Sequence, residues 1–367
     1  MDILKTIGIE SSKFNCSAYL VGGPVRDIVL GKKSKDLDIV VESKTKKNCI
    51  KKLTENLART LKAKSFLYYK EFGTSTIFLR NGKSIDLAMA RSEVYKKPGV
   101  LPVVRPSDIY SDLKRRDFTI NSMAICLSED KFGLLVDPNN GLDDIRKKQI
   151  RVLHKKSFVD DPTRILRAIR FSVRLDFKIE KETLGLLKES IKRNDLKNVS
   201  KERIKKEFLA VLVEKDTYKI LKKFSEFGIF LFDLKLTKEK QYMLKNLNIG
   251  KNPVPLKLSI LLLGEKINKI KSILKEMKLE REITNQIITV FRYISGDIIK
   301  NLPEWSKYFF KIAKIEKRKF FIDGNALIKL GFKPGPVFRK ILSDVNKKNF
   351  SNYIQAEKYI LRRYSPA

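Results

Sequence analysis

Residues 19–42 read YLVGGPVRDIVLGKKSKDLDIVVE, and this stretch decides the fold of the chain around it. The apolar run 19–21 predicts a buried strand. Gly22 and Gly23 follow it and let the backbone turn sharply and approach a ligand closely. Pro24 suits the first position of a helix, where its missing N–H costs nothing. The segment therefore predicts a strand, a glycine turn and a short helix whose N-terminus favours phosphate.

Charged side chains in this helix and in the strand after it also favour a phosphate-binding site. Arg26 lies in the first helical turn, where it adds charge-assisted hydrogen bonds to an anion. Asp36 and Asp38 open the next strand on one face, with Leu37 between them directed into the core. Two carboxylates this close repel each other unless a cation lies between them, and oxygen ligands beside a phosphate-binding turn suit Mg²⁺ held with a nucleoside triphosphate. The alternative is a pair of solvated carboxylates, which the combination of turn, arginine and carboxylates disfavours.

Composition limits the class of partner. The chain has 367 residues, which suits two to four packed units, and a formal net charge of +36. That excess predicts a polyanionic partner such as nucleic acid, whereas the alternative is a proteome that uses lysine everywhere. Cys16, Cys49 and Cys126 have no metal-ligand spacing and fit a reducing, cytoplasmic setting. No apolar run reaches membrane-spanning length, so we expect no membrane partner.

Sequence patterns predict a mixed region followed by helices. In chain order the predicted elements are a helix at 46–61, strands at 65–69, 75–80 and 84–90, a functional loop at 91–106, a strand at 132–136 and helices at 163–175, 180–192, 200–213 and 217–227. Asn81-Gly82 predicts an antiparallel hairpin. Asp86 lies in the third of these strands and is either a third catalytic carboxylate or a structural aspartate bonded to a neighbouring loop.

The helix at 163–175 carries one apolar stripe and one stripe of arginines. Asp161 precedes Arg164 by three residues, so both lie on one face. A carboxylate only accepts hydrogen bonds and a guanidinium only donates them. Cytosine and adenine both present an amino donor beside an acceptor nitrogen, whereas uracil and guanine present a carbonyl beside an N–H. Asp161 with Arg164 therefore matches C and A, the alternative being a capping aspartate beside a solvated basic face.

The segment RRDFTINSMA (residues 115–124) places Arg116 and Asp117 beside an apolar helix. The two residues are either a buried ion pair or a ribose site, because Asp accepts from hydroxyls and Arg donates to phosphate. Further on, the turn residues 137–141 mark a boundary.

Together these motifs resemble class II tRNA nucleotidyltransferases (CCA-adding enzymes) and the related bacterial poly(A) polymerases. LVGGPVRD with DLDIVV resembles their catalytic motif, which implies that Asp36 and Asp38 bind Mg²⁺ and that Gly23 and Arg26 contact the triphosphate. RRDFTINSMA is similar to the ribose-sensing motif. DDPTRILRAIRF resembles the base-reading helix, which implies nucleotide contacts from Asp161, Arg164, Arg167 and Arg170.

The resemblance implies an α+β chain in four parts. They are a nucleotidyltransferase head with a mixed β-sheet and helices at 1–136, a base-selecting helical neck at 137–227, a helical body at 228–301 and a tRNA-binding helical tail at 302–367. The base-reading motif of this chain begins Asp160-Asp161, where the family usually has Glu-Asp.

The implied reaction is template-independent transfer of C and/or A from CTP or ATP to the 3′ end of tRNA by a two-metal mechanism with Mg²⁺, releasing pyrophosphate. The basic helical arm would hold the acceptor and T arms of tRNA. The sequence leaves open whether the product is CCA, CC, A alone or a poly(A) tail, and it leaves the oligomeric state unknown. The rival functions are a poly(A) polymerase and a catalytically silent RNA-binding protein.

Overall fold

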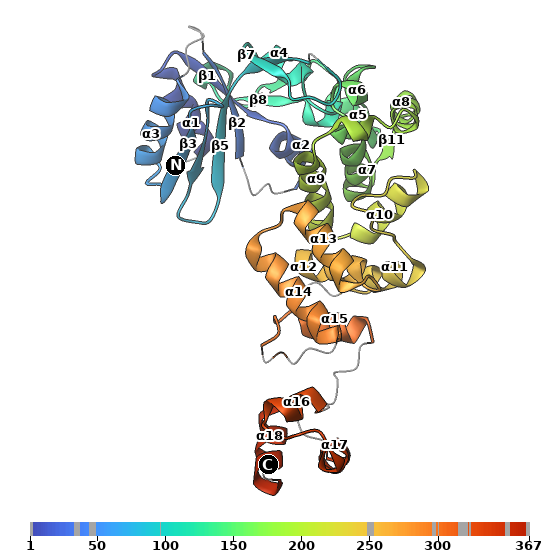
Figure 1. The fold of residues 1–367 in the computed structure, drawn as a ribbon. Coiled ribbons are helices and arrows are strands. Elements are labelled where there is room, and N and C mark those ends of the chain that lie inside the picture. The colour runs from blue at the N-terminus through green and yellow to red at the C-terminus, as the bar shows by residue number, and fades with distance from the viewer. Residues whose placement is uncertain are drawn as a thin grey trace.

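A computed structural model describes residues 3–32, 37–43, 49–95, 97–247, 253–295, 299, 301–314, 322, 324–348 and 353–364. The fold is α+β, with an N-terminal mixed sheet followed by helices that extend away from it (Figure 1). The N-terminal elements are α1 (Ile3–Ser12), β1 (Cys16–Val21), α2 (Gly23–Val29), β2 (Leu37–Ser43), α3 (Ile50–Thr60), β3 (Ser65–Tyr69), β4 (Thr74–Phe78), β5 (Ser84–Met89), β6 (Arg91–Val94), β7 (Val103–Pro106), α4 (Ile109–Lys114), η1 (Thr119–Asn121), β8 (Ala124–Cys126), η2 (Glu129–Lys131) and β9 (Leu135–Val136).

The rest of the described chain is almost entirely helical. Its elements are α5 (Gly141–Arg146), β10 (Gln149–Ile150), α6 (Ser157–Asp160), α7 (Thr163–Leu175), β11 (Lys178–Ile179), α8 (Lys181–Lys192), η3 (Asp195–Asn198), α9 (Lys201–Val213), α10 (Thr217–Glu226), α11 (Lys238–Lys245), α12 (Pro253–Leu262), α13 (Ile267–Met277), α14 (Arg281–Ser295), α15 (Ser306–Ile312), α16 (Gly324–Lys329), α17 (Pro336–Lys347) and α18 (Tyr353–Arg363). The short parallel pair β10–β11 was absent from the sequence predictions, because two-residue strands carry no readable alternation.

The strands of the described residues form a seven-stranded sheet in the order β3-β4-β5-β2-β1-β8-β9. β2 and β5 pair in parallel, and the other neighbours pair antiparallel, so the sheet is mixed as expected. The hairpin predicted at Asn81-Gly82 joins β4 to β5. The strand predicted at 132–136 is confirmed only at β9, because Gly133 adopts positive φ and turns the chain there.

Strand alternation sorts the side chains of β2 onto two faces. Ile39 and Val41 join the large core under α1 and α3, and Leu37 packs against the same core. Val40 joins a smaller cluster with α4 on the opposite face. Asp38 shares that opposite face with Val40, because residues two apart in a strand point the same way. The predicted separation of Leu37 from Asp38 is confirmed.

Residues 91–106, predicted to be a loop, instead contain the antiparallel hairpin β6–β7. The prediction was wrong because the β-branched residues Val94, Val103 and Val104 favour extended backbone. Pro98 and Gly99 lie between the two strands, and Gly99 has a φ of 73°.

The C-terminal helices α16, α17 and α18 form a separate small core. Its buried side chains include Leu327, Ile341, Val345 and Ile360, and they belong to a different cluster from the main core. Figure 1 shows these helices at the far end of the chain from the sheet. In the part of the chain that the structure describes, no helix is both long and apolar enough to cross a membrane.

Lys257 in α12 is a buried ammonium at the junction of α9, α10 and α12. Its side chain is 1% exposed, and Nζ donates to the Glu214 carbonyl at 2.6 Å and to Thr217 Oγ1 at 2.8 Å. Burial lowers the pKa of Lys257 from 10.5 to about 8, against the raising effect of Glu214. Keeping this group charged inside the core costs free energy.

We expect Lys257 to make the free energy of unfolding rise with pH. The folded state loses this proton near pH 8 and the unfolded state near 10.5, so the burial penalty is complete below 8 and is relieved between the two values. Relative to Lys257→Met, the unsubstituted protein should gain about 3 kcal/mol over this interval, because each pKa unit corresponds to about 1.4 kcal/mol. Urea unfolding of both proteins across that pH range measures the gain. A difference that stays constant with pH would contradict the buried-ammonium account.

Candidate active site

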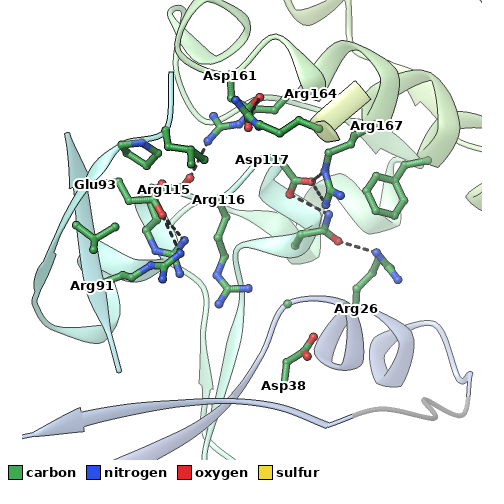
Figure 2. Close-up of a pocket in the computed structure, with 18 of the residues that line it drawn as sticks. Arg26, Asp38, Arg91, Glu93, Arg115, Arg116, Asp117, Asp161, Arg164 and Arg167 are labelled. Carbon is green, nitrogen blue, oxygen red and sulfur yellow. Dashed lines mark hydrogen bonds and ion pairs between the residues drawn. The ribbon is translucent and has the colours of Figure 1, made fainter. Parts of the chain in front are cut away.

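A cleft of about 1050 Å³ lies between the sheet region and the helices that follow it. From the N-terminal side it is lined by the Gly22-Gly23 turn, Asp38, the β6–β7 hairpin and Arg116. α7 and Arg203 of α9 line it from the other side, and Figure 2 shows the side chains converging from both. Residues more than a hundred positions apart thus meet in one space.

The glycine turn at the cleft floor has the conformation that the sequence predicted. Gly22 has a φ of 72°, in the left-handed region that favours glycine, and Pro24 occupies the start of α2. An ideal Cβ on Gly22 would lie 2.6 Å from Arg116 Nη1. The turn is therefore tight, and the Arg116 guanidinium lies directly over it.

Buried Asp112 of α4 sets the orientation of Arg116. Its side chain is fully buried, and Oδ2 accepts from Arg116 Nη2 at 2.9 Å, while Oδ1 accepts from Arg115 Nη2 at 2.7 Å. Asp117, the neighbour in sequence, is not the partner of Arg116. The ion pair between Arg116 and Asp117 that the sequence allowed is therefore not formed. Arg116 pairs with Asp112, and Asp117 pairs with Arg167.

Asp38 faces the cleft below Arg116, as Figure 2 shows. The parallel register pairs it with Asp86 on β5, so both carboxylates lie on one face of the sheet. Asp86 is outside the cleft lining, and its carboxylate accepts from Thr76 Oγ1 at 2.5 Å, on a neighbouring strand and not on a loop. Asp36 lies outside the described residues. Within those residues no group of three or more His, Cys, Asp or Glu side chains could hold a metal ion.

The donors at this position nevertheless suit a hard cation. Asp38 supplies carboxylate oxygens, with a second carboxylate, Asp86, beside it in the register. Mg²⁺ in nucleotide sites is commonly held by one or two carboxylates together with phosphate oxygens of the substrate. Asp38 with a bound triphosphate therefore fits such a group.

A continuous chain of hydrogen bonds runs from α2 to α7. Buried Arg26 donates from Nη1 to Asn121 Oδ1 at 2.7 Å, and Asn121 Nδ2 donates to Asp117 Oδ1 at 3.0 Å. Arg167 Nε and Nη2 both donate to Asp117 Oδ2, at 2.8 and 2.7 Å. Figure 2 shows this chain crossing the cleft wall. It links the glycine turn to the arginine helix.

Electrostatics stabilise the charged form of both members of the central pair. Burial raises the pKa of Asp117, but Arg167 and the hydrogen bond from Asn121 outweigh it, and the pKa lies below its usual range. Burial lowers the pKa of Arg167, but Asp117 and Glu207 outweigh it, and that pKa lies above its usual range. The pair is therefore ionised at neutral pH.

Asp161 and Arg164 line the same cleft but do not pair with each other. Asp161 Oδ1 accepts from Arg203 Nη2 at 2.6 Å and from the backbone N–H of Thr163 at 3.0 Å. Arg164 donates to Ser157 Oγ at 2.6 Å and to the carbonyl oxygen of Arg115 at 2.8 Å. The aspartate thus accepts from the first residue of α7, as a capping residue would, and it also lies at the cleft as the base-reading interpretation required.

Arg170 lies behind the cleft wall and does not line the cleft. It is buried and pairs at 3.2 Å with Glu207 of α9 and with Glu214, the residue that follows α9. The Arg170 guanidinium lies 4.8 Å from the centre of the Phe171 ring, a cation–π distance. Arg170 therefore holds α7 against α9.

Sequence reasoning missed several cleft residues that depend on distant partners. Phe171 lies 5.3 Å from the guanidinium carbons of both Arg26 and Arg167. Asn121 and Arg203 each bond to a predicted site residue. Phe171 could have been found, because it lies seven residues after Arg164 on the same helical face.

Comparisons with known proteins show which families and relatives the chain is similar to. The family model described as the poly A polymerase head domain matches residues 18–151, and the model described as the probable RNA and SrmB-binding site of polymerase A matches residues 176–239. An A-adding tRNA nucleotidyltransferase of Halalkalibacterium halodurans is 31% identical over 93% of this chain and 86% of the relative. Two further relatives named as A-adding tRNA nucleotidyltransferases, from Geobacter sulfurreducens and Aquifex aeolicus, are longer, and the chain covers 26% and 25% of them.

Solved structures are similar along almost the whole chain. A CCA-adding enzyme in an apo form superposes with a TM-score of 0.71 at 30% identity, over 99% of this chain and 95% of that one. The Thermotoga maritima CCA-adding enzyme complexed with tRNA superposes with a TM-score of 0.65 at 29% identity, over 98% and 94%.

We predict that Asp117→Asn destabilises the fold, because it removes the carboxylate charge that accepts two hydrogen bonds from Arg167. Removing one member of such a buried pair costs about 3 kcal/mol. Chemical denaturation of the variant and the unsubstituted protein measures the loss. Asp143→Asn is the matched control, because Asp143 pairs with Lys147 at 2.7 Å on the exposed surface and should change stability by less than about 1 kcal/mol. Equal effects of the two substitutions would exclude the buried pair as a special contact.

Proposed function

Because the chain belongs to the tRNA nucleotidyltransferase family, we propose that it transfers a nucleotide from CTP or ATP to the 3′ end of tRNA without a template. One observation carries the proposal. The cleft joins the glycine turn and Asp38 on one wall to Asp161 and Arg164 on the other. A nucleotide placed there would have its phosphates at the turn and its base at α7.

In this arrangement the triphosphate lies against Gly22, Gly23, Arg26 and Arg116. Backbone N–H groups of the turn and two guanidiniums supply donors to phosphate oxygens. Asp112 and Asn121 hold these guanidiniums in place before any ligand binds. Fixed donors of this kind lose less entropy on binding than free side chains do.

The α7 side of the site selects the base. Asp161 accepts from the exocyclic amino group, and Arg164 donates to the ring nitrogen beside it, a pattern shared by C and A. Arg203 fixes the carboxylate from one side. Asp117 acts on the site through Arg167, which it orients, and Arg170 acts by holding α7 in place.

Asp38 and Asp36 are the proposed ligands of a divalent metal ion, Mg²⁺ by the chemistry of its oxygen donors. Held there, such an ion would supply positive charge to the triphosphate and to the tRNA 3′-hydroxyl, whose attack on the α-phosphate releases pyrophosphate. Asp86 supports Asp38 from the neighbouring strand, or joins the ligands if it releases Thr76.

The product we propose is the terminal A. The H. halodurans relative that aligns along almost the whole chain is an A-adding enzyme, and so are the two longer relatives. We also propose a cytoplasmic location, contacts to the acceptor and T arms of tRNA, and the division into head (1–136), neck (137–227), body (228–301) and tail (302–367).

Nucleotide incorporation on three tRNAs tests the product. The substrates end at the discriminator base, at the first C and at the second C. We expect a single A on the tRNA that ends in CC and no incorporation of C on the other two. Addition of C and then A would identify a CCA-adding enzyme, and long A tails on an unrelated RNA would identify a poly(A) polymerase.

Asp38→Asn should abolish incorporation while leaving tRNA affinity within about twofold, because the substitution removes a ligand charge but no basic residue. Single-turnover incorporation and filter binding measure the two properties. Ser84→Ala on the neighbouring β5 is a control that should retain incorporation. Full activity of Asp38→Asn would overturn the metal-ligand role, and an unsubstituted protein that binds tRNA but incorporates nothing would favour the RNA-binding rival.

A further inference from the structure

A second basic cavity lies on the helical part of the chain, away from the cleft. It measures about 840 Å³ and we call it the neck groove. Its lining comes from the α5–β10 connection, the C-terminal end of α7, β11 and α10. The basic residues that line it are Lys147, Lys148, Lys178, Lys219, Lys222 and Lys223.

The neck groove and the cleft lie on opposite faces of α7. Arg164, Arg167 and Phe171 face the cleft, whereas Ser172 and Val173 line the neck groove. At 100° per residue, the two sets point in nearly opposite directions around the helix. Figure 1 shows α10 and β11 on the side of α7 that faces away from the sheet.

Half of the lysines in the neck groove are already neutralised. Lys147 pairs with Asp143 at 2.7 Å, Lys219 with Asp216 at 2.9 Å and Lys222 with Glu226 at 3.8 Å.

The other three lysines, Lys148, Lys178 and Lys223, have no ion pair within the described residues. Lys223 makes only a hydrogen bond of 3.4 Å to Ser172 Oγ. Asp176 and Glu226 are the acidic residues of the lining, so positive charge is in excess.

We propose that the neck groove binds the phosphate backbone of tRNA, outside the cleft that holds its 3′ end. Lysine ammonium groups bind phosphates as point charges without reading sequence, which suits a site that must accept every tRNA. The groove is open and larger than one phosphate group, and the half-buried ring of Tyr218 borders it. The family model described as RNA-binding covers β11 and α10, which carry four of the six lysines.

The dipole of helix α7 offers a role for these lysines that is simpler than RNA binding. Ammonium groups near the C-terminal end of α7 stabilise its partial negative charge, and they do so without any ligand. That role predicts a loss of stability when the lysines are removed, but no change in the salt dependence of RNA binding. The two accounts therefore separate in one experiment.

The test is the triple variant Lys148→Gln, Lys178→Gln and Lys223→Gln in the full chain. tRNA affinity is measured over a series of salt concentrations. Each lost phosphate contact reduces the slope of log Kd against log salt by about one, so we expect a reduction of about three and an affinity about tenfold weaker at low salt. The KM for ATP and the kcat at saturating tRNA should stay unchanged.

A matched control removes the same charge elsewhere. Lys51→Gln, Lys52→Gln and Lys64→Gln change exposed residues on and beside α3, outside both cavities. This variant should change the slope by less than about one. Equal slopes for the two triple variants would overturn the proposal. The unfolding midpoint of each variant shows whether it is folded, and Lys178→Gln alone, at an exposed position, should still reduce the slope by about one.

The inference rests on tRNA as the substrate, but its readout is binding and not incorporation. A protein that bound tRNA through the neck groove and incorporated no nucleotide would overturn the proposed function alone. A protein that added nucleotides normally, with a salt slope indifferent to the three lysines, would overturn the neck groove alone.

Discussion

The contact between Asp117 and Arg167 is the constraint on which the site depends. Asp117 belongs to the sheet region and Arg167 to α7, and the two hydrogen bonds between them cross the boundary between those parts. Asn121 extends the contact to Arg26 at the phosphate turn, and Glu207 extends it to α9. Because ion pairs of this kind need fixed geometry to offset desolvation, the two walls of the cleft are held at a defined separation.

This arrangement explains how so basic a chain builds an ordered nucleotide site. Unpaired guanidiniums around a cleft repel one another, and carboxylates pair with several of the arginines in and behind the cleft wall. Asp112 holds Arg116, Asp117 holds Arg167, and Glu207 with Glu214 holds Arg170. The carboxylates thus fix the arginines while leaving a positive potential for the triphosphate.

α7 organises both faces of the region that follows the sheet. One face lines the cleft with arginines and Phe171, and the opposite face borders the neck groove. Its apolar residues Ile165, Leu166 and Ile169 are buried in the main core. A helix clamped in the core keeps two charged surfaces at a fixed angle, so one tRNA could engage both without any rearrangement of α7.

Local signals in the sequence determined the strand, the glycine turn, the separation of Leu37 from Asp38 and the full extent of α7. Periodicity and turn chemistry act over a few residues and can be read directly, and most of the site residues that the motifs predicted line the cleft. The tertiary structure alone decided the partners: that Arg116 pairs with Asp112 rather than Asp117, that Arg170 turns away from the cleft, and that 91–106 forms a hairpin. Such choices depend on side chains and strands brought together by packing, and their distance along the chain hides them from any local pattern.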